Sequence, residues 1–398
     1  MAGTIYITGS GVVSAIGLSK AEVLDSLMKR RAGIGEIKHL QTEHKEFPVG
    51  EVNLSNDEMC SRLGIDRKTP VTRTALMGML ALEEALDEAK LGKNTDENIA
   101  FLSGTTVGGM DMTERYYLDY LANNNHDEYI ALHDCGATTQ MIADHFGIFS
   151  LATSISTACS SAANAIITGA NMIKAGLVDI AVVGGSECLT KFHLNGFNSL
   201  MILDREQCRP FDATRAGLNL GEGAAYLVIE SEESMRRRGV EPLAVLSGYG
   251  NACDAFHQTA SSDDGEGAFL AMSQALDMAG LKPEDIDYIN AHGTGTPNND
   301  MSESTAIMRL FGQNYRVSST KSYTGHTTSA SGSIEAVICL LAIKNNFAPV
   351  SLNVKVLMEN GFAPITESSG CQTRNIENVL CNSFGFGGND SSLIFSKL

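Results

Sequence analysis

Cys159 has the sequence setting of a covalent nucleophile. Residues 155–157 predict the end of a short strand, and the spacing of apolar residues over 163–173 predicts a helix that ends near Gly176. A thiol at such a strand-to-helix turn lies beside unpaired backbone N–H groups and the positive end of the helix dipole, which can lower its pKa. We therefore interpret Cys159 as a candidate nucleophile. The alternative is a small buried apolar residue, as many free cysteines are.

Two histidines occupy comparable positions later in the chain. His292 lies in NAHGTGTP and His326 in STKSYTGHT, and each follows a predicted strand. Chain segments that leave the carboxyl ends of strands collect at one edge of an α/β fold, so these histidines are expected near Cys159. One cysteine with two histidines favours acyl transfer through a thioester. The other seven of the nine histidines are interpreted as structural.

The elements that must position these side chains alternate along the chain. Strands are predicted at 5–8, 98–104, 155–157, 179–184, 224–230, 244–246, 287–291 and 317–320, and helices at 20–29, 72–89, 110–122, 163–173, 267–279, 302–311 and 333–344. This alternation predicts an α/β fold with largely parallel sheets covered on both faces. Residues 9–14 are interpreted as a tight turn rather than a nucleotide-binding loop, and 123–134 as irregular.

The second half of the chain repeats the first. LSGTT at 102–106 corresponds to NAHGT at 290–294, and the strand, loop and helix over 317–344 correspond to the Cys159 turn. The charged segment 231–239 is interpreted as a break between them. We expect a half at 1–235 that carries the cysteine and a half at 236–398 that carries both histidines. A pseudo-twofold axis between the halves would bring their matching turns to one pocket.

Composition limits the class of partner. The formal charge of -18 disfavours nucleic acid and anionic membranes, and no segment is long and apolar enough to span a bilayer. The first residues lack the pattern of a signal peptide, and nine scattered cysteines form no disulfide framework, so reduced thiols in a cytoplasm are expected. Without a CxxC or HExxH motif, neither a metal nor a cofactor is expected.

Five motifs in order resemble those of the β-ketoacyl-acyl carrier protein synthases of the type II elongating kind, in the thiolase-like superfamily. They are TACSSAANAI at 157–166, RPFDATRAGLNLGEGA at 209–224, NAHGTGTPNND at 290–300, SSTKSYTGHTTSASG at 318–332 and CNSFGFGGND at 381–390. The resemblance covers nearly the whole chain. It implies a thiolase-like fold in which two βαβ-type halves form a layered α-β-α-β-α sandwich.

The same resemblance implies roles for five polar residues. Cys159 would take an acyl chain from a carrier-protein thioester. His292 and His326 would bind the thioester carbonyl of malonyl-carrier protein and assist the loss of CO2, because neutral imidazoles can stabilise the developing oxyanion. Lys321 would act through charge and positioning. Glu335 would orient the loop that carries this lysine.

Further positions are carried over from the family to the substrate pocket. The backbone N–H groups of Cys159 and Phe386 would stabilise the oxyanion formed at the acyl-cysteine, and the Phe386 side chain would gate access to the sulfur. The remaining expected substrate contacts are Val107, Phe384, Thr294 and Thr296.

The resemblance also implies partners. Relatives accept their substrates from a small acidic carrier protein, and the candidate contacts here are Arg205, Arg62, Arg67 and Lys68. Relatives are homodimers in which the strand before the cysteine lies near the twofold axis. A homodimer without a cofactor is therefore expected.

Two alternatives remain beside this interpretation. A thiolase needs a second cysteine inside the last glycine-rich loop, whereas Cys381 precedes that loop here. A chain-length partner would lack the nucleophile. Two departures also bear on substrate: the loop 327–331 is polar where glycine and alanine are usual, and Asp390 replaces an asparagine. Both would suit a specialised polyene or polyketide synthase as well as a fatty acid synthase.

Overall fold

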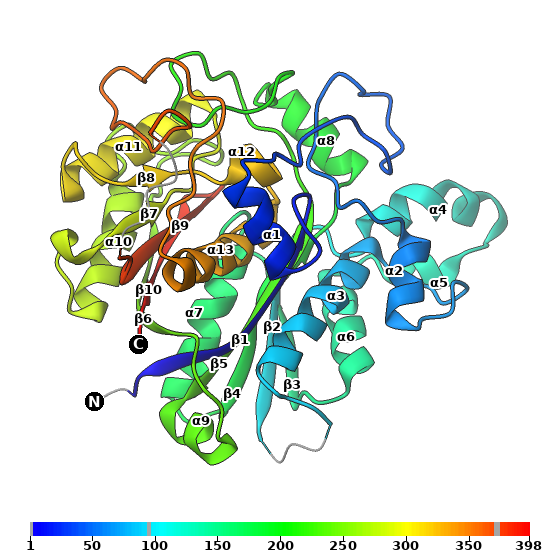
Figure 1. Ribbon diagram of the computed structural model, residues 1–398. Coiled ribbons are helices and arrows are strands. Elements are labelled where there is room, and N and C mark those ends of the chain that lie inside the picture. Colours follow the sequence, from blue (N-terminus) through cyan, green and yellow to red (C-terminus); the bar gives the residue numbers. More distant parts are fainter. Residues whose placement is uncertain (1–2, 94–96, 370–374) are drawn as a thin grey trace.

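The computed structural model describes residues 3–93, 97–369 and 375–398, which leaves Cys371 outside the described part. One mixed sheet of ten strands runs through the molecule in the order β3-β2-β4-β5-β1-β6-β10-β9-β7-β8 (Figure 1). The strands are β1 Ile5–Ser14, β2 Ile99–Gly104, β3 Leu151–Ile155, β4 Ile180–Glu187, β5 Gly223–Ser231, β6 Ala244–Cys253, β7 Tyr288–Asn290, β8 Val317–Ser318, β9 Asn378–Gly385 and β10 Asn389–Ser396.

The strand order confirms that the second half of the chain repeats the first. From the outer edge inward the halves read β3-β2-β4-β5-β1 and β8-β7-β9-β10-β6, so β6 to β10 take the places of β1 to β5. The two inner strands meet where Ile5–Ile7 pair with 244–246. We propose that residues 1–235 and 236–398 be treated as the two halves of the fold.

The expectation of largely parallel sheets is wrong. Parallel pairing is confined to β3-β2-β4 and β8-β7-β9, the two outer triplets. The inner strands β5, β1, β6 and β10 pair antiparallel with every neighbour. Antiparallel neighbours need no crossover helix, and β9 and β10 are accordingly joined by a short hairpin turn.

Helices form three layers around the sheet. They are α1 Lys20–Met28, α2 Asn56–Leu63, α3 Arg73–Glu88, α4 Met110–Asn123, α5 Asp127–Ile130, α6 Cys135–Phe146, α7 Ser161–Lys174, α8 Lys191–Ser199, α9 Glu232–Arg238, α10 Glu266–Ala279, α11 Pro297–Phe311, α12 Lys321–Thr324 and α13 Ser331–Asn345. In Figure 1, α7 and α13 lie between the two halves of the sheet, α3 and α6 cover one outer side, and α10 covers the other. This is the layered α-β-α-β-α arrangement that was expected.

Residues 9–14 continue strand β1, so the predicted tight turn is wrong. The glycines serve close packing of a helix on the strand: a Cβ added to Gly11 would lie 2.1 Å from the carbonyl oxygen of Ala81 in α3. The second half repeats the device, because a Cβ on Gly250 in β6 would lie 2.1 Å from the carbonyl oxygen of Ala271 in α10. Glycine is required where a backbone approaches so closely.

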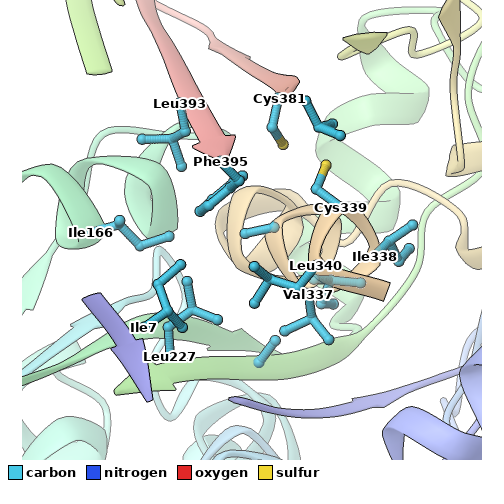
Figure 2. Close-up of a cluster of buried hydrophobic side chains, with 14 of the residues drawn as sticks. Ile7, Ile166, Leu227, Val337, Ile338, Cys339, Leu340, Cys381, Leu393 and Phe395 are labelled. Carbon is cyan, nitrogen blue, oxygen red and sulfur yellow. The ribbon is translucent and has the colours of Figure 1, made fainter. Parts of the chain in front are cut away.

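The central layer contains the helix that supports the candidate site. Residues 331–343 of α13 are buried on every side, because the helix runs between the two halves of the sheet. Figure 2 shows Val337 and Leu340 of this helix among Leu227 from the first half and Phe395 from the second. A helix packed on all sides gives its polar residues fixed positions.

Several predicted boundaries also differ. The strand before Cys159 is β3, which ends at Ile155, and the helix after His292 begins at Pro297. The irregular segment contains the short α5. The charged break is the helix α9, capped by Ser231 and stabilised by an ion pair between Arg236 and Glu232 one turn apart. Within the described residues, none of the helices combines the length and apolarity of a membrane span.

Candidate active site

The turn that presents Cys159 is tight and held by side chains. It lies between β3 and α7, and Ala158 adopts a left-handed backbone conformation with φ of 53°. Ser161 Oγ accepts a hydrogen bond from the Thr157 N–H at 2.9 Å and donates one to the Ala158 carbonyl at 2.6 Å. These contacts fix the cysteine at the start of α7, where only 6% of it is exposed.

The structure brings Cys159, His292, His326, Lys321 and Glu335 together. Nε2 of His326 lies 3.0 Å from Sγ of Cys159. The two imidazole centroids are 5.2 Å apart with nearly perpendicular planes. Nζ of Lys321 lies 3.3 Å from Nδ1 of His292 and 2.5 Å from Oε1 of Glu335. These contacts connect the five residues into one site at the junction of the halves. All five side chains are buried.

The loop of His326 is fixed by the segment 219–221. The His326 N–H donates to the Asn219 carbonyl at 2.7 Å, and the Gly221 N–H donates to the His326 carbonyl at 2.9 Å. The imidazole Nδ1 lies 2.9 Å from Oγ of Ser331. Ser331 belongs to the polar loop that departs from the family pattern. Ser331 therefore contacts the histidine that touches the sulfur.

The loop of His292 is fixed by a buried carboxylate. Glu303 of α11 accepts hydrogen bonds from the His292 N–H at 2.8 Å and the Gly293 N–H at 2.7 Å. Lys321 carries donors only, so its contact with the imidazole is a bond donated to Nδ1. The proton of the neutral imidazole is then on Nε2. His292 is thereby prepared as a hydrogen-bond donor.

A cavity of about 320 Å³ opens onto the cysteine. Phe384 lies beside His292 with ring centroids 5.8 Å apart, and Phe386 stacks on Phe197 at 5.8 Å. The lining residues are Cys159, Phe197, Ile202, Leu218, 259–261, His292, Thr294, 296–299, His326 and 384–388. Four of the expected substrate contacts, Phe384, Phe386, Thr294 and Thr296, are among them.

Burial determines the protonation of the site. It lowers the pKa of both His292 and His326 well below the ordinary value, and the nearby Lys321 lowers each further. The pKa of the Cys159 thiol is raised to about 11, because burial outweighs the attraction of Lys321 and the hydrogen bond from the Phe386 N–H. The expected lowering of the thiol pKa is therefore wrong. The resting site holds a neutral thiol between neutral imidazoles.

The backbone of Phe386 lies against the nucleophile as expected for an oxyanion donor. Its N–H hydrogen bonds to the Cys159 sulfur, as does the N–H of Cys159 itself. Gly387 and Gly388 follow with φ of 83° and 76°, the left-handed region that glycine allows. The hairpin turn between β9 and β10 thus directs a backbone donor at the sulfur.

Besides Lys321 and Glu335, which lie behind His292, five candidate residues lie outside this cavity. Val107 is buried, and its N–H donates to Glu187 at 3.1 Å, so it does not line the cavity beside Cys159. The cationic residues Arg205, Arg62, Arg67 and Lys68 are all exposed. Arg205 lies over the ring of Phe47 and three residues beyond Ile202, which lines the cavity. Of the four cationic residues, Arg205 is therefore the one closest along the chain to a residue that lines the cavity.

Comparison with known proteins decides the family. The descriptions "Beta-ketoacyl synthase, N-terminal domain" and "Beta-ketoacyl synthase, C-terminal domain" match residues 2–234 and 243–355. The chain belongs to the β-ketoacyl synthase family.

Full-length relatives agree. A 3-oxoacyl-(acyl-carrier-protein) synthase 2 of Staphylococcus aureus (strain COL) is 32% identical over 99% of this chain and 98% of its own length. The nodulation protein E of Rhizobium meliloti is 32% identical over 99% of both chains. Among solved structures, the ishigamide ketosynthase/chain length factor superposes with a TM-score of 0.92 at 30% identity over both full lengths. The chain is therefore an acyltransferase of this family with the thiolase-like fold.

Several residues of this β-ketoacyl synthase site were not predicted individually. Glu303 and Ser331 hold the histidine loops, and Glu187 accepts hydrogen bonds from the turn after β2 and from Ser329. Phe197 stacks on Phe386 from helix α8. Ser331 lies inside the motif at 318–332 and Glu303 lies three residues after the motif at 290–300, so spacing could have suggested both. Phe197 has no sequence signal, because a single aromatic residue in a short helix is common.

Asp390, where the family resemblance leads us to expect an asparagine, is the second residue after the hairpin turn 385–388 and belongs to β10. It is 4% exposed, and its pKa is raised to about 8, first by burial and then by the neighbouring Asp254 and Glu303. Among the described residues, none donates a hydrogen bond to its carboxylate. The Asp390 carboxyl therefore binds its proton more tightly than an ordinary aspartate does.

Proposed function

We propose that this β-ketoacyl synthase is a 3-oxoacyl-acyl carrier protein synthase that carries its acyl chain on Cys159. The observation that supports this most directly is the 3.0 Å contact of the cysteine sulfur with Nε2 of His326. His292 opens onto the same cavity of about 320 Å³. The site therefore combines a nucleophile, a base and two hydrogen-bond donors where an acyl thioester could enter.

The first step is acyl transfer. The Cys159 sulfur attacks the thioester carbonyl of the acyl-carrier protein while its proton passes to His326 Nε2. The oxyanion is stabilised by the N–H groups of Cys159 and Phe386, both of which hydrogen bond to the sulfur. The carbon–sulfur bond to the carrier then breaks, and the carrier leaves as a thiol with the proton from His326. The acyl chain remains on the cysteine.

The second step is decarboxylative condensation. Nε2 of His292 donates a hydrogen bond to the thioester carbonyl of malonyl-carrier protein, and burial keeps both imidazoles neutral. His326 supplies the second donor in this step as the tautomer with its proton on Nε2, after the proton has moved from Nδ1. The bond to the carboxylate breaks, CO2 leaves, and the electron pair forms an enolate. The enolate carbon attacks the acyl carbonyl, the carbon–sulfur bond to Cys159 breaks, and the thiolate takes up one proton from solvent. The product is a 3-oxoacyl chain longer by two carbons.

An assay with both carrier-protein substrates tests this function. Purified protein supplied with acyl- and malonyl-carrier protein should release CO2 and form 3-oxoacyl-carrier protein, and Cys159→Ala should form none. His145→Ala is a matched control, because this histidine lies at the end of α6, away from the cavity lining. Product formation by Cys159→Ala at the wild-type rate would refute the assignment.

Docking of the acidic carrier would use a local cationic surface, because the chain itself carries a formal charge of -18. Arg205 is the best candidate, with Arg62, Arg67 and Lys68 as further contacts. Arg205→Glu should raise KM for the carrier protein about tenfold and leave kcat nearly unchanged. Arg236→Glu is the control, since Arg236 is exposed on α9. Equal effects of the two charge reversals would exclude a specific role for Arg205.

We further propose a cytoplasmic homodimer formed along the edge strand β3. This strand lies at one end of the sheet and has an unpaired, half-exposed edge, which is suited to pairing with a second copy. A heteromeric assembly is the alternative, because two similar solved structures, 30% and 31% identical, are of a ketosynthase with a chain length factor. Light scattering of the purified chain distinguishes them: a dimer mass supports self-pairing, and a monomer indicates a missing partner.

The non-catalytic alternative has its own test. A chain-length partner of a second synthase would form no product alone and would gain activity only with a cysteine-bearing homologue. The contact between Cys159 and His326 argues against it, because a non-catalytic subunit has no need of a nucleophile beside a base. A thiolase is disfavoured because Cys381 faces Cys339 in the core (Figure 2) and is absent from the cavity lining.

A further inference from the structure

A cluster of amide and hydroxyl groups lies behind the cysteine turn. Its centre is Oδ1 of Asn389, the residue that follows the hairpin turn 385–388. This oxygen lies 2.8 Å from Ser160 Oγ, 2.7 Å from Asn164 Nδ2 and 3.0 Å from Asn251 Nδ2. The two amide groups donate to this oxygen, and the Ser160 hydroxyl shares its single proton between Asn389 Oδ1 and the Thr157 carbonyl. Asn389 therefore connects β10 with the cysteine turn, with α7 and with β6.

The cysteine turn is tied into the same cluster. Asn164 Nδ2 also lies 2.9 Å from Thr157 Oγ1, and Ser160 Oγ lies 2.7 Å from the Thr157 carbonyl. Residues 157–160 and the end of the hairpin turn thus share donors and acceptors. A displacement of one segment would break hydrogen bonds of the other.

The hairpin turn has two further backbone attachments: the Gly387 N–H donates to the Gln258 carbonyl at 2.8 Å, and the Gly388 carbonyl accepts a hydrogen bond from the Asp254 N–H at 2.8 Å. Neither bond reaches the cysteine turn. Gly387 and Gly388 have positive φ. Because glycine has no side chain, neither residue makes side-chain contacts that would hold this conformation. At the start of the hairpin turn, Gly385 lies so close to the cysteine turn that an added Cβ would be 2.9 Å from the Thr157 carbonyl oxygen. Between these anchors lies Phe386, whose N–H hydrogen bonds to the Cys159 sulfur.

We propose that Asn389 is a positioning residue that holds the hairpin turn 385–388 on the cysteine turn, and so keeps the Phe386 N–H in place as an oxyanion donor. The proposal rests on Cys159 as the nucleophile. A donor stabilises an oxyanion only at hydrogen-bond distance, so a small shift of the hairpin turn weakens acyl transfer. Reactions of the sulfur that form no oxyanion are expected to tolerate the same shift.

Two reactions of Cys159 therefore test the role of Asn389. Acylation by hexanoyl-N-acetylcysteamine forms a tetrahedral oxyanion, whereas alkylation by iodoacetamide displaces iodide and forms none. Asn389→Leu removes the acceptor while keeping side-chain size. We expect its single-turnover acylation to slow about 10- to 100-fold, by analogy with the loss of an oxyanion donor, and its alkylation to stay within about threefold of wild type. Intact mass and peptide mapping measure both rates at Cys159.

Two further variants complete the test. Asn164→Ala removes one donor from α7 and should show the same split to a smaller degree, even if Asn389→Leu folds poorly. His145→Ala is the control, because this histidine lies at the end of α6 and makes no contact with the cluster around Asn389, and both of its rates should match wild type. Unchanged acylation in Asn389→Leu, or a parallel loss of both reactions in the folded variants, would overturn the proposal. Absence of any acyl adduct in the wild type would instead refute Cys159 as the nucleophile.

Discussion

Nζ of Lys321 lies 3.3 Å from Nδ1 of His292, and Nε2 of His326 lies 3.0 Å from Sγ of Cys159. The two histidines thus have different partners, although they lie side by side. One is held as a donor by a lysine, and the other touches the sulfur of Cys159. This difference leads to separate predictions for the two.

His292→Ala should leave acylation of Cys159 near the wild-type rate and slow decarboxylation of malonyl-carrier protein about 100- to 1000-fold. The reason is the loss of one oxyanion donor, in a position where Lys321 fixes the proton on Nε2. Mass measurement of the acyl-enzyme and CO2 release from malonyl-carrier protein separate the two steps. Slow acylation in this variant would show that His292 acts before condensation.

His326→Ala should slow both steps. Its Nε2 is the group positioned to accept the thiol proton, and removal of a general base costs about 100- to 10,000-fold in rate. The rate at which the acyl-enzyme forms in a single turnover, measured with the acyl-carrier protein used for His292→Ala, reports on the first step. A variant that acylates as fast as His292→Ala would contradict the proposed proton transfer to His326.

Alkylation of Cys159 should accelerate steadily with pH. The thiol pKa is raised to about 11, so between pH 7 and 9 the thiolate fraction, and with it the rate with iodoacetamide, should rise about tenfold per unit. Peptide mapping separates Cys159 from the exposed Cys253. A rate that levels off below pH 8 would mean that the helix dipole outweighs burial.

Asp390→Asn should stabilise the protein, increasingly so as the pH rises. The folded-state pKa is about 8 against 3.8 for an ordinary Asp, so the folded state binds the proton more tightly. The contribution of Asp390 to the free energy of unfolding therefore falls as the pH rises from about 4 to 8. Asparagine does not titrate, so the variant does not lose stability in this way.

Chemical denaturation of Asp390→Asn at pH 5 and pH 8 measures the effect, with a gain of about 1–3 kcal/mol expected at the higher pH. Asp263→Asn is the control, because Asp263 is exposed. A gain that is equal at both pH values would show that Asp390 is ionised in the folded protein throughout this range.

The sequence allowed much of the architecture to be predicted, because periodicity marks the buried helices and the motifs recur in two halves. The central helices were placed to within a few residues, and the repeated strand order agrees with the predicted duplication. Strand direction was not accessible, since β5 and β10 have the same apolar pattern in a parallel or an antiparallel sheet. The role of Gly11 was missed because its neighbour Ala81 is distant in sequence.

The candidate site was predictable as a set of residues but not as an electrostatic environment. Motif order indicated that Cys159 and His326 belong together, and they do lie in contact. The pKa of the thiol could not be predicted, because it depends on how completely the surrounding layers exclude water. Contacts such as Asn389 with Ser160, 229 positions apart, are likewise set by the fold alone.

The most direct test of the account is the mass of the intact protein after incubation with acyl-carrier proteins of several chain lengths, followed by peptide mapping. The account predicts a stable gain of one acyl group on Cys159, absent in Cys159→Ala and chased off by malonyl-carrier protein. A folded wild-type protein that gains no acyl group, or gains it at another residue, would contradict the proposal that Cys159 carries the growing chain.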